Sequence, residues 1–107
     1  MKLGNILSNN TFGEKVQLKL IMETPFTREI SIHIDKDQIM EEHQSPLPIT
    51  VNVVKGNLRF TVEQKDYILE EGDLLSLEGA IPHSFLALEK SIIRLTMSLG
   101  SKIPQRK

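Results

Sequence analysis

The chain has 107 residues, 39% of them hydrophobic and 25% charged, which suits one globular domain without room for a second. Its formal net charge of −1 argues against a nucleic-acid-binding protein that relies on a basic face. The absence of cysteine excludes disulfides, thiolate nucleophiles and zinc fingers, and no apolar run approaches the ~20 residues that cross a bilayer. We therefore expect a single cytoplasmic domain over residues 1–107, with neither nucleic acid nor a membrane as a partner.

Two early segments, residues 15–22 and 29–35, alternate between apolar and polar residues, which predicts strands with one buried face. The apolar positions are Val16, Leu18 and Leu20 in the first segment and Ile30, Ile32 and Ile34 in the second. If these side chains face the core, His33 faces outward and away from any site. Residues 1–14 lack the pattern and are expected to form an N-terminal extension.

The middle of the chain is expected to hold a loop followed by a hairpin. Residues 36–48 are polar and end in two prolines, which favours loop and short extended pieces over helix. Residues 49–55 are apolar and β-branched, which predicts a strand buried on both faces. Gly56 and Asn57 form a turn signal before the alternating residues 58–63, so these two segments should pair.

Short strands continue to the end of the chain without a convincing helical pattern. The expected segments are residues 67–69, 74–77, 83–88 and 92–99. Gly72 marks a bend at which positive φ is expected. Many short strands at near-regular spacing indicate a sandwich or a barrel. The residues predicted to line it are Val51, Val53, Phe60, Leu77, Phe85 and Leu95. Residues 100–107, with the basic cluster Lys102, Arg106 and Lys107, are expected to be a flexible, solvated tail.

The second half of the chain carries the more specific of two sequence motifs. It reads Gly72-Asp73-Leu74-Leu75-Ser76-Leu77-Glu78-Gly79-Ala80-Ile81-Pro82-His83. This segment is similar to the second motif of the small single-domain cupins, in which a Gly-Asp bend leads through a Pro-x-Gly loop to a histidine. Their first motif runs from His-x-His through a glutamate to a glycine; His43 falls near its start, and Val53-Val54-Lys55-Gly56 looks like its close. From about Thr27 to Ser98, the chain thus resembles a small cupin.

The resemblance implies an all-β fold, an antiparallel double-stranded β-helix or jelly-roll barrel. It also implies a homodimer, often built by pairing of N-terminal strands, for which residues 15–22 offer an edge. The metal site of the family is incomplete here, because its second histidine falls on Ser45 and its glutamate on Ile49. In the Pro-x-Gly loop, Glu78 replaces the proline and Ala80 replaces the glycine.

Two ligand-type residues, His43 and His83, remain at matching positions. Imidazole nitrogen suits divalent transition metals such as Zn, Mn, Fe or Ni, and Gln44 or Glu42 could add a third donor. Two histidines rarely hold a transition metal tightly, because durable sites use three or four protein ligands. An apolar pocket with polar anchors is instead the common form of a small-molecule site. The residues predicted to bind that molecule are His43, His83, Ile49, Val51, Phe85 and Glu78.

Three functions are consistent with these residues. The first is a pocket that binds a small molecule without catalysis, supported by Ile49 in place of a carboxylate. The second is a metal-dependent enzyme of the oxygenase, isomerase or decarboxylase type, with His43 and His83 as ligands. The third is a mainly structural, dimerising barrel. Phosphate-binding glycine loops, nucleophile elbows and glycosidase-like carboxylate pairs are absent from the sequence.

Overall fold

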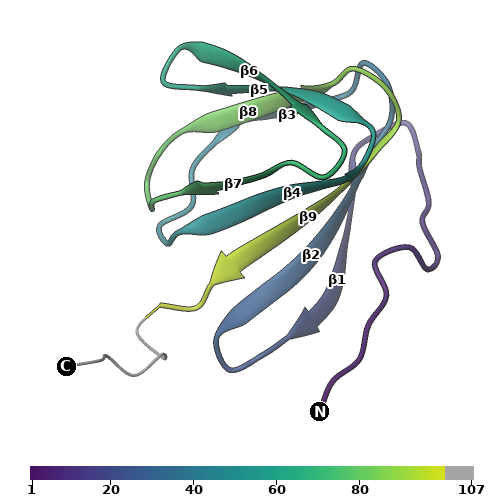
Figure 1. The fold of residues 1–107 in the computed structure, drawn as a ribbon, viewed down its shortest axis with the longest axis vertical. Coiled ribbons are helices and arrows are strands. Elements are labelled where there is room, and N and C mark those ends of the chain that lie inside the picture. The colour runs from purple at the N-terminus through teal and green to yellow at the C-terminus, as the bar shows by residue number, and fades with distance from the viewer. Residues whose placement is uncertain (101–107) are drawn as a thin grey trace.

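The computed structural model describes residues 1–100, which form nine β-strands in two antiparallel sheets (Figure 1). The strands are β1 (Gln17–Glu23), β2 (Thr27–Ile34), β3 (Ile39–His43), β4 (Ile49–Lys55), β5 (Asn57–Val62), β6 (Lys65–Glu70), β7 (Leu74–Leu77), β8 (His83–Ala87) and β9 (Ser91–Ser98). This part of the chain contains no helix, so the all-β fold expected from the sequence is confirmed. The basic cluster Lys102, Arg106 and Lys107 lies outside the described residues.

The chain crosses repeatedly between the two sheets. One sheet has the strand order β1-β2-β9-β4-β7 and the other has the order β3-β8-β5-β6. Most connections change sheet, so strands that are distant in sequence become hydrogen-bonded neighbours, as in a jelly roll. The expected pairing of residues 49–55 with 58–63 is therefore wrong, because β4 pairs with β7 and β9 whereas β5 pairs with β6 and β8. One consequence is that β3 pairs with β8, which brings His43 opposite His83 although the two are 40 positions apart.

Side chains between the sheets form a hydrophobic core. Its buried members are Ile32, Ile34, Ile49, Val51, Val53, Leu58, Phe60, Phe85, Ala87 and Ile93. Strands β4, β5 and β8 each contribute alternate residues, as expected for strands with one face on the core. The prediction that residues 49–55 are buried on both faces is therefore wrong. Thr50, Asn52 and Val54 are only partly buried, because they face away from the other sheet.

The segment between β2 and β4 contains a strand where we expected mostly loop. Strand β3 is the edge of the four-stranded sheet, and four of its five residues are exposed. Because most of its side chains are exposed, β3 does not need an apolar residue at every second position. Its sequence therefore lacks the alternation that identifies a strand.

The β5–β6 hairpin also turns earlier than the sequence indicates. Its two turn residues, Glu63 and Gln64, both have positive φ, 52° and 66°. Such turns are normally marked by Asn-Gly or Asp-Gly, and Glu-Gln carries no such signal. The expected turn at residues 64–66 is therefore shifted, and β6 begins at Lys65.

Strand β1 is less buried than its alternation predicts. Leu18 and Leu20 pair with Ile32 and Ile30 of β2 and so lie on the core side of the sheet. They are nevertheless 56% and 55% exposed. The reason is that β1 is an edge strand that packs chiefly against β2, and the four-stranded sheet does not cover it. Apolar side chains thus line an opening between the sheets.

The N-terminal residues 1–14 carry no strand and run beside β1 and β2 on the outer face of the five-stranded sheet (Figure 1). The Lys2 ammonium group donates to the backbone oxygen of Glu23, and Lys19 Nζ donates to Ser8 O at 3.1 Å. The Phe12 ring lies 5.6 Å from the ring of His33. The predicted extension is therefore a cover for part of the outer face.

His33 lies beneath this cover. It points away from the core, as its position in the alternation predicts, but it is only 1% exposed. Its Nε2 atom lies 2.9 Å from both Asn10 Nδ2 and Ser31 Oγ. Because an amide nitrogen can only donate, Nε2 accepts, and the ring proton of the neutral form is on Nδ1. Nδ1 is buried and has no partner among residues 1–100. Burial, together with the charge of Lys19, lowers the pKa of His33.

We expect His33 to make the protein less stable as the pH falls from about 7 to about 5. Its folded-state pKa lies below the unfolded value of about 6.5, so the unfolded chain binds the proton more readily. The contribution of the neutral ring is therefore complete above that value and is lost as the pH drops below it. His33→Gln keeps an acceptor for Asn10 but does not titrate, so it should cost about 1 kcal/mol at neutral pH and flatten the pH profile.

Urea unfolding of both proteins across this pH range checks the expectation. The pKa of His83 is also lowered, mainly by burial, but His83 is present in both proteins and cancels in their difference. Parallel pH profiles for the wild type and His33→Gln would contradict the prediction.

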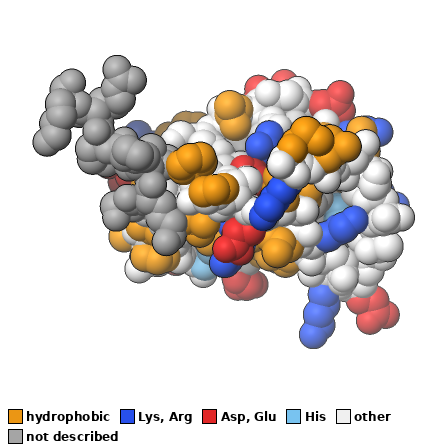
Figure 2. All heavy atoms as spheres, turned by 90° about the horizontal axis from the view of Figure 1, so that it is seen from below, with side chains coloured by type: hydrophobic (Ala, Val, Ile, Leu, Met, Phe, Trp, Pro, Cys, Tyr) orange, Lys and Arg blue, Asp and Glu red, His pale blue; other side chains and the backbone are white. Residues whose placement is uncertain are grey.

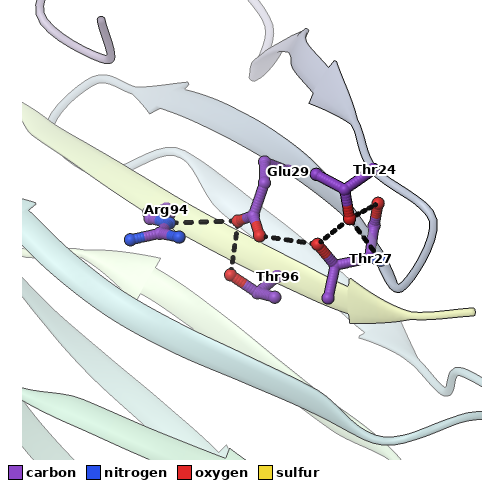
Figure 3. A network of polar contacts seen from close by, with 5 residues as sticks. All are labelled: Thr24, Thr27, Glu29, Arg94 and Thr96. Atoms are coloured by element: carbon purple, nitrogen blue, oxygen red, sulfur yellow. Dashed lines mark hydrogen bonds and ion pairs between the residues drawn. The ribbon is translucent and has the colours of Figure 1, made fainter. Parts of the chain in front are cut away.

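A second polar group is buried on the outer face of the same sheet (Figure 3). The carboxylate of Glu29 accepts hydrogen bonds from Arg94 Nε at 3.0 Å, Thr96 Oγ1 at 2.6 Å and Thr27 Oγ1 at 2.9 Å. Thr24 Oγ1 lies 3.0 Å from Thr27 Oγ1 and extends the network. Burial alone would raise the pKa of Glu29, but the hydrogen bonds and the charge of Arg94 outweigh it and lower the pKa.

Apolar side chains on the surface are interspersed with charged ones. On the face seen in Figure 2, hydrophobic side chains form several separate groups with lysine, arginine and acidic side chains between them. Leu18 of β1 and Ile39 of β3, 56% and 54% exposed, border the opening between the sheets. Residues 1–100 include no helix with the length and hydropathy that spanning a bilayer requires.

Candidate functional site

A β-bulge in β3 places His43 beside His83. Met40 pairs with Phe85 of β8, and regular pairing would then set Glu42 opposite His83. An extra residue in β3 shifts the register, so that His43 takes this position instead. The two ring centroids are 4.3 Å apart, and the ring planes are inclined at 60°. Tertiary pairing thus joins two imidazoles from distant parts of the chain.

Both rings are oriented by the same local hydrogen bond. His43 Nδ1 lies 2.8 Å from Glu41 O, and His83 Nδ1 lies 3.0 Å from Ile81 O, in each case two residues back along the chain. A carbonyl oxygen can only accept, so Nδ1 carries the proton in both neutral rings. The lone pair of each neutral ring is therefore on Nε2. Neither Nε2 has a hydrogen-bonding partner among residues 1–100.

The two histidines differ in their surroundings. His83 is 3% exposed and stacks on Phe60, with ring centroids 5.6 Å apart and planes inclined at 14°. Burial lowers the pKa of His83; its hydrogen bond to Ile81 opposes the shift, and nearby His43 adds to it. His83 is therefore neutral at physiological pH. His43 is exposed, so it is the member of the pair that an incoming molecule meets first.

His43 lies at one end of an open cleft between the two sheets, which we call the β1–β3 cleft. Its volume is about 890 Å³. The apolar residues that line it are Val16, Leu18, Ile30, Ile39, Met40, Leu95 and Met97. The polar ones are Glu14, Lys15, Gln38, Glu41, Glu42 and His43. The cleft exists because β1 and β3 are both edge strands, so no hydrogen bonding closes the sheets on this side.

Known proteins provide a test of the fold. A scan against protein-family models finds no match, and neither does a search of curated proteins. Among solved structures, an RmlC-like cupin protein from Desulfovibrio desulfuricans matches with 19% identity and a TM-score of 0.83, over 92% of this chain and 96% of that chain. A cupin superfamily protein from Desulfitobacterium hafniense matches with 9% identity and a TM-score of 0.80, over 92% and 90%. An uncharacterized conserved protein with a double-stranded β-helix domain from Klebsiella pneumoniae matches with 14% identity and a TM-score of 0.79, over 92% and 89%.

The chain has the cupin fold.

The cupin-like loop before His83 keeps its backbone conformation although its residues differ. Ala80, at the place of the loop glycine, has φ of +65°, which is unusual for a residue with a Cβ. Its N–H donates to Ser45 O at 2.6 Å. This bond ties the β7–β8 loop to the segment after His43. The loop thus holds the ends of β3 and β8 together next to the histidine pair.

The residues at this site do not fit a resident transition metal. Among residues 1–100, no three histidine, cysteine, aspartate or glutamate side chains lie together in a way that could hold a metal ion. The position that corresponds to the metal-binding glutamate is Ile49, which is 4% exposed and belongs to the core. Two imidazoles fall short of the three or four protein ligands of a durable site.

The structure places the predicted site residues in three different environments. His43 and His83 are adjacent to each other, as described above. Ile49, Val51 and Phe85 are core residues and do not line the β1–β3 cleft. Glu78 is exposed in the loop between β7 and β8, and it does not line the cleft either. Gln44, considered above as a third metal donor, is also exposed.

Sequence reasoning missed most of the cleft lining. Ile30 and Leu95 were expected to pack in the core or the barrel wall, and nothing in their alternation separates a core position from a cleft position. The one available signal was an apolar face on an N-terminal strand, Val16 and Leu18, at an expected sheet edge. An apolar face on an edge strand has less protein to pack against and is therefore a candidate surface for a ligand.

Proposed function

We propose that this cupin binds a small, largely apolar molecule in the β1–β3 cleft, with His43 at the polar end of the site. The observation that carries the proposal is the cleft itself. Its volume of about 890 Å³ falls within the range of small-molecule sites. Apolar side chains form much of the wall beside a few polar groups, which is the usual composition of such sites.

The histidine pair supports the same proposal. His83 is buried and neutral, and the exposed His43 lies next to it. The Nε2 atoms of the two rings have no hydrogen-bonding partner among residues 1–100. Unused polar atoms beside an apolar cleft are suited to orienting a ligand. We place this function in the cytoplasm, a location supported by the lack of cysteine in the sequence.

Binding of a neutral, environment-sensitive dye such as Nile red tests the proposal. We expect saturable binding that a Leu18→Glu substitution weakens by about tenfold or more, because it puts a charge on the apolar wall. Leu18 is 56% exposed, so this substitution should leave the fold intact.

Leu74→Glu is the matched control. Leu74 is a 68% exposed leucine on the edge strand β7, and it does not line the cleft. Dye affinity should stay within about twofold of the wild type in this variant. Absence of saturable binding, or equal losses in both variants, would refute the proposal.

The two alternative functions predict different results. A metal-dependent enzyme would be purified without chelator carrying about one equivalent of a transition metal, and His83→Ala would lose it. A mainly structural barrel would associate through the free edge of β1, giving twice the chain mass by light scattering. If that dimer covers the cleft, dye affinity will fall as protein concentration rises, and the cleft would then be an interface.

A further inference from the structure

The polar end of the β1–β3 cleft restricts the chemistry of the head group it can accept, an inference that rests on the proposed function. The first restriction comes from hydrogen bonding. His43 Nδ1 and His83 Nδ1 both donate to backbone carbonyls, at 2.8 Å and 3.0 Å. Each neutral ring therefore has only its Nε2 lone pair left, which accepts a hydrogen bond and cannot donate one. Of the two, His43 lines the cleft, so a ligand head group that only accepts, such as a carboxylate, gains no hydrogen bond from it.

The second restriction comes from charge. The cleft lining includes the acidic residues Glu14, Glu41 and Glu42 against one basic residue, Lys15. Glu41 and Glu42 directly precede His43 in β3, so both carboxylates belong to the same end of the cleft as the exposed imidazole. Ionised carboxylates only accept hydrogen bonds, and their charge favours a cation.

The third restriction comes from the apolar wall. Leu95 and Met97 of β9, Ile30 of β2 and Met40 of β3 contribute apolar side chains to the wall of the cleft. A fully polar cation would lose hydration along this wall without compensation. The ligand must therefore combine an apolar body with a single charged end.

We propose that the β1–β3 cleft selects an apolar molecule that carries a protonated amine. The ammonium group donates to the free Nε2 of His43 and lies within the field of Glu41 and Glu42, and the hydrocarbon body packs on the wall formed by β1, β2 and β9. A primary ammonium group has three donors and a positive charge to offer the acceptors at this end of the cleft. An alcohol has one donor and no charge, and a carboxylate has neither a donor nor the favourable sign.

Displacement of Nile red by three compounds with the same hydrocarbon chain tests this selection: hexylamine, 1-hexanol and hexanoate. The displacement is measured at about pH 8, where an alkylamine is protonated. We expect hexylamine to displace the dye at a concentration about tenfold or more below that of hexanoate, with hexanol between them. Replacing His43 by leucine should weaken hexylamine and hexanol together, because both donate to Nε2.

Paired charge variants separate the carboxylates of the cleft from the net charge of the protein. E41Q/E42Q removes two charges at the cleft and keeps the side-chain shapes. E70Q/E71Q removes two charges from exposed glutamates that do not line it. The preference for hexylamine over hexanol should fall about threefold in the first variant, as expected for exposed ion pairs, and stay unchanged in the second.

The outcomes distinguish the two proposals. If hexanoate displaces the dye as well as hexylamine does, or if both charge variants behave alike, the amine selection is wrong and the small-molecule site stands. If the dye does not bind saturably, or if Leu18→Glu does not weaken its binding, the proposed small-molecule site is wrong. The proposed selection of amines is then wrong as well.

Discussion

Replacing Gly56 by alanine is expected to lower the free energy of unfolding by roughly 3–4 kcal/mol. Gly56 joins β4 to β5 and has φ of +91°, where a residue with a Cβ is strained. An added Cβ would also overlap Ser91 Oγ and lie 2.6 Å from the backbone oxygen of Lys90. Ser91 cannot easily move, because its Oγ accepts from Asn57 N at 3.1 Å and donates to Glu89 O at 2.7 Å. Equilibrium unfolding in urea measures the loss.

Gly72→Ala is a matched control for this substitution. Gly72 has nearly the same backbone conformation, with φ of +93°, but a Cβ there meets no atom within 4 Å. It should therefore cost only the backbone strain, about 1 kcal/mol. The difference between the two variants measures the steric overlap with Ser91 and Lys90. Equal losses would show that the overlap relaxes at no cost. They would contradict the close packing of Ser91 and Lys90 against the turn between β4 and β5.

Replacing Glu29 by alanine is the second large effect, with an expected loss of about 2–3 kcal/mol at neutral pH. The substitution removes the shared acceptor of Arg94, Thr96 and Thr27, and it does so beneath the N-terminal cover, where Glu29 is 8% exposed. Glu29→Gln keeps one oxygen and the side-chain shape but loses the charge. It should cost about half as much, because it weakens the bond to Arg94 more than the bonds to the threonines.

The pH dependence identifies the contribution of the charge. The folded-state pKa of Glu29 is below the ordinary value of 4.5, so the unfolded chain takes up this proton first as the pH falls. The stability from the ionised carboxylate is therefore complete above that value and is lost as the pH drops through the folded-state pKa. Wild-type stability should fall more steeply in acid than that of either variant. An identical acid profile for the wild type and Glu29→Gln would show that Glu29 contributes no charge-dependent stability.

Much of the fold could be predicted from local patterns in the sequence. The alternation in residues 29–35 identified β2, and the positive φ expected at Gly56 and Gly72 is observed at both. The Gly72–His83 motif pointed to a cupin, and the cupin fold is confirmed by the solved structures. These features depend on neighbouring residues alone, because strand period and turn conformation are set within a few positions.

Predictions about burial held for core positions such as Val51, Val53 and Phe60 and were weaker at the sheet edge and on the outer face. Leu18 was assigned to a buried face and is exposed, whereas His33 was assigned outward and is covered by residues 1–14. The alternation of apolar and polar residues shows which side chains share a face of a strand. Whether that face is buried depends on segments from another part of the chain.

The sequence by itself determined most of the strands, the turn glycines and the two histidines at motif positions. The tertiary structure alone decided that a bulge in β3 pairs His43 with His83, and that β1 and β3 leave a cleft between their sheets. A bulge depends on the register between two strands that are distant in sequence, and a cleft depends on where two sheets fail to meet. Neither the bulge nor the cleft can therefore be predicted from any single segment of the chain.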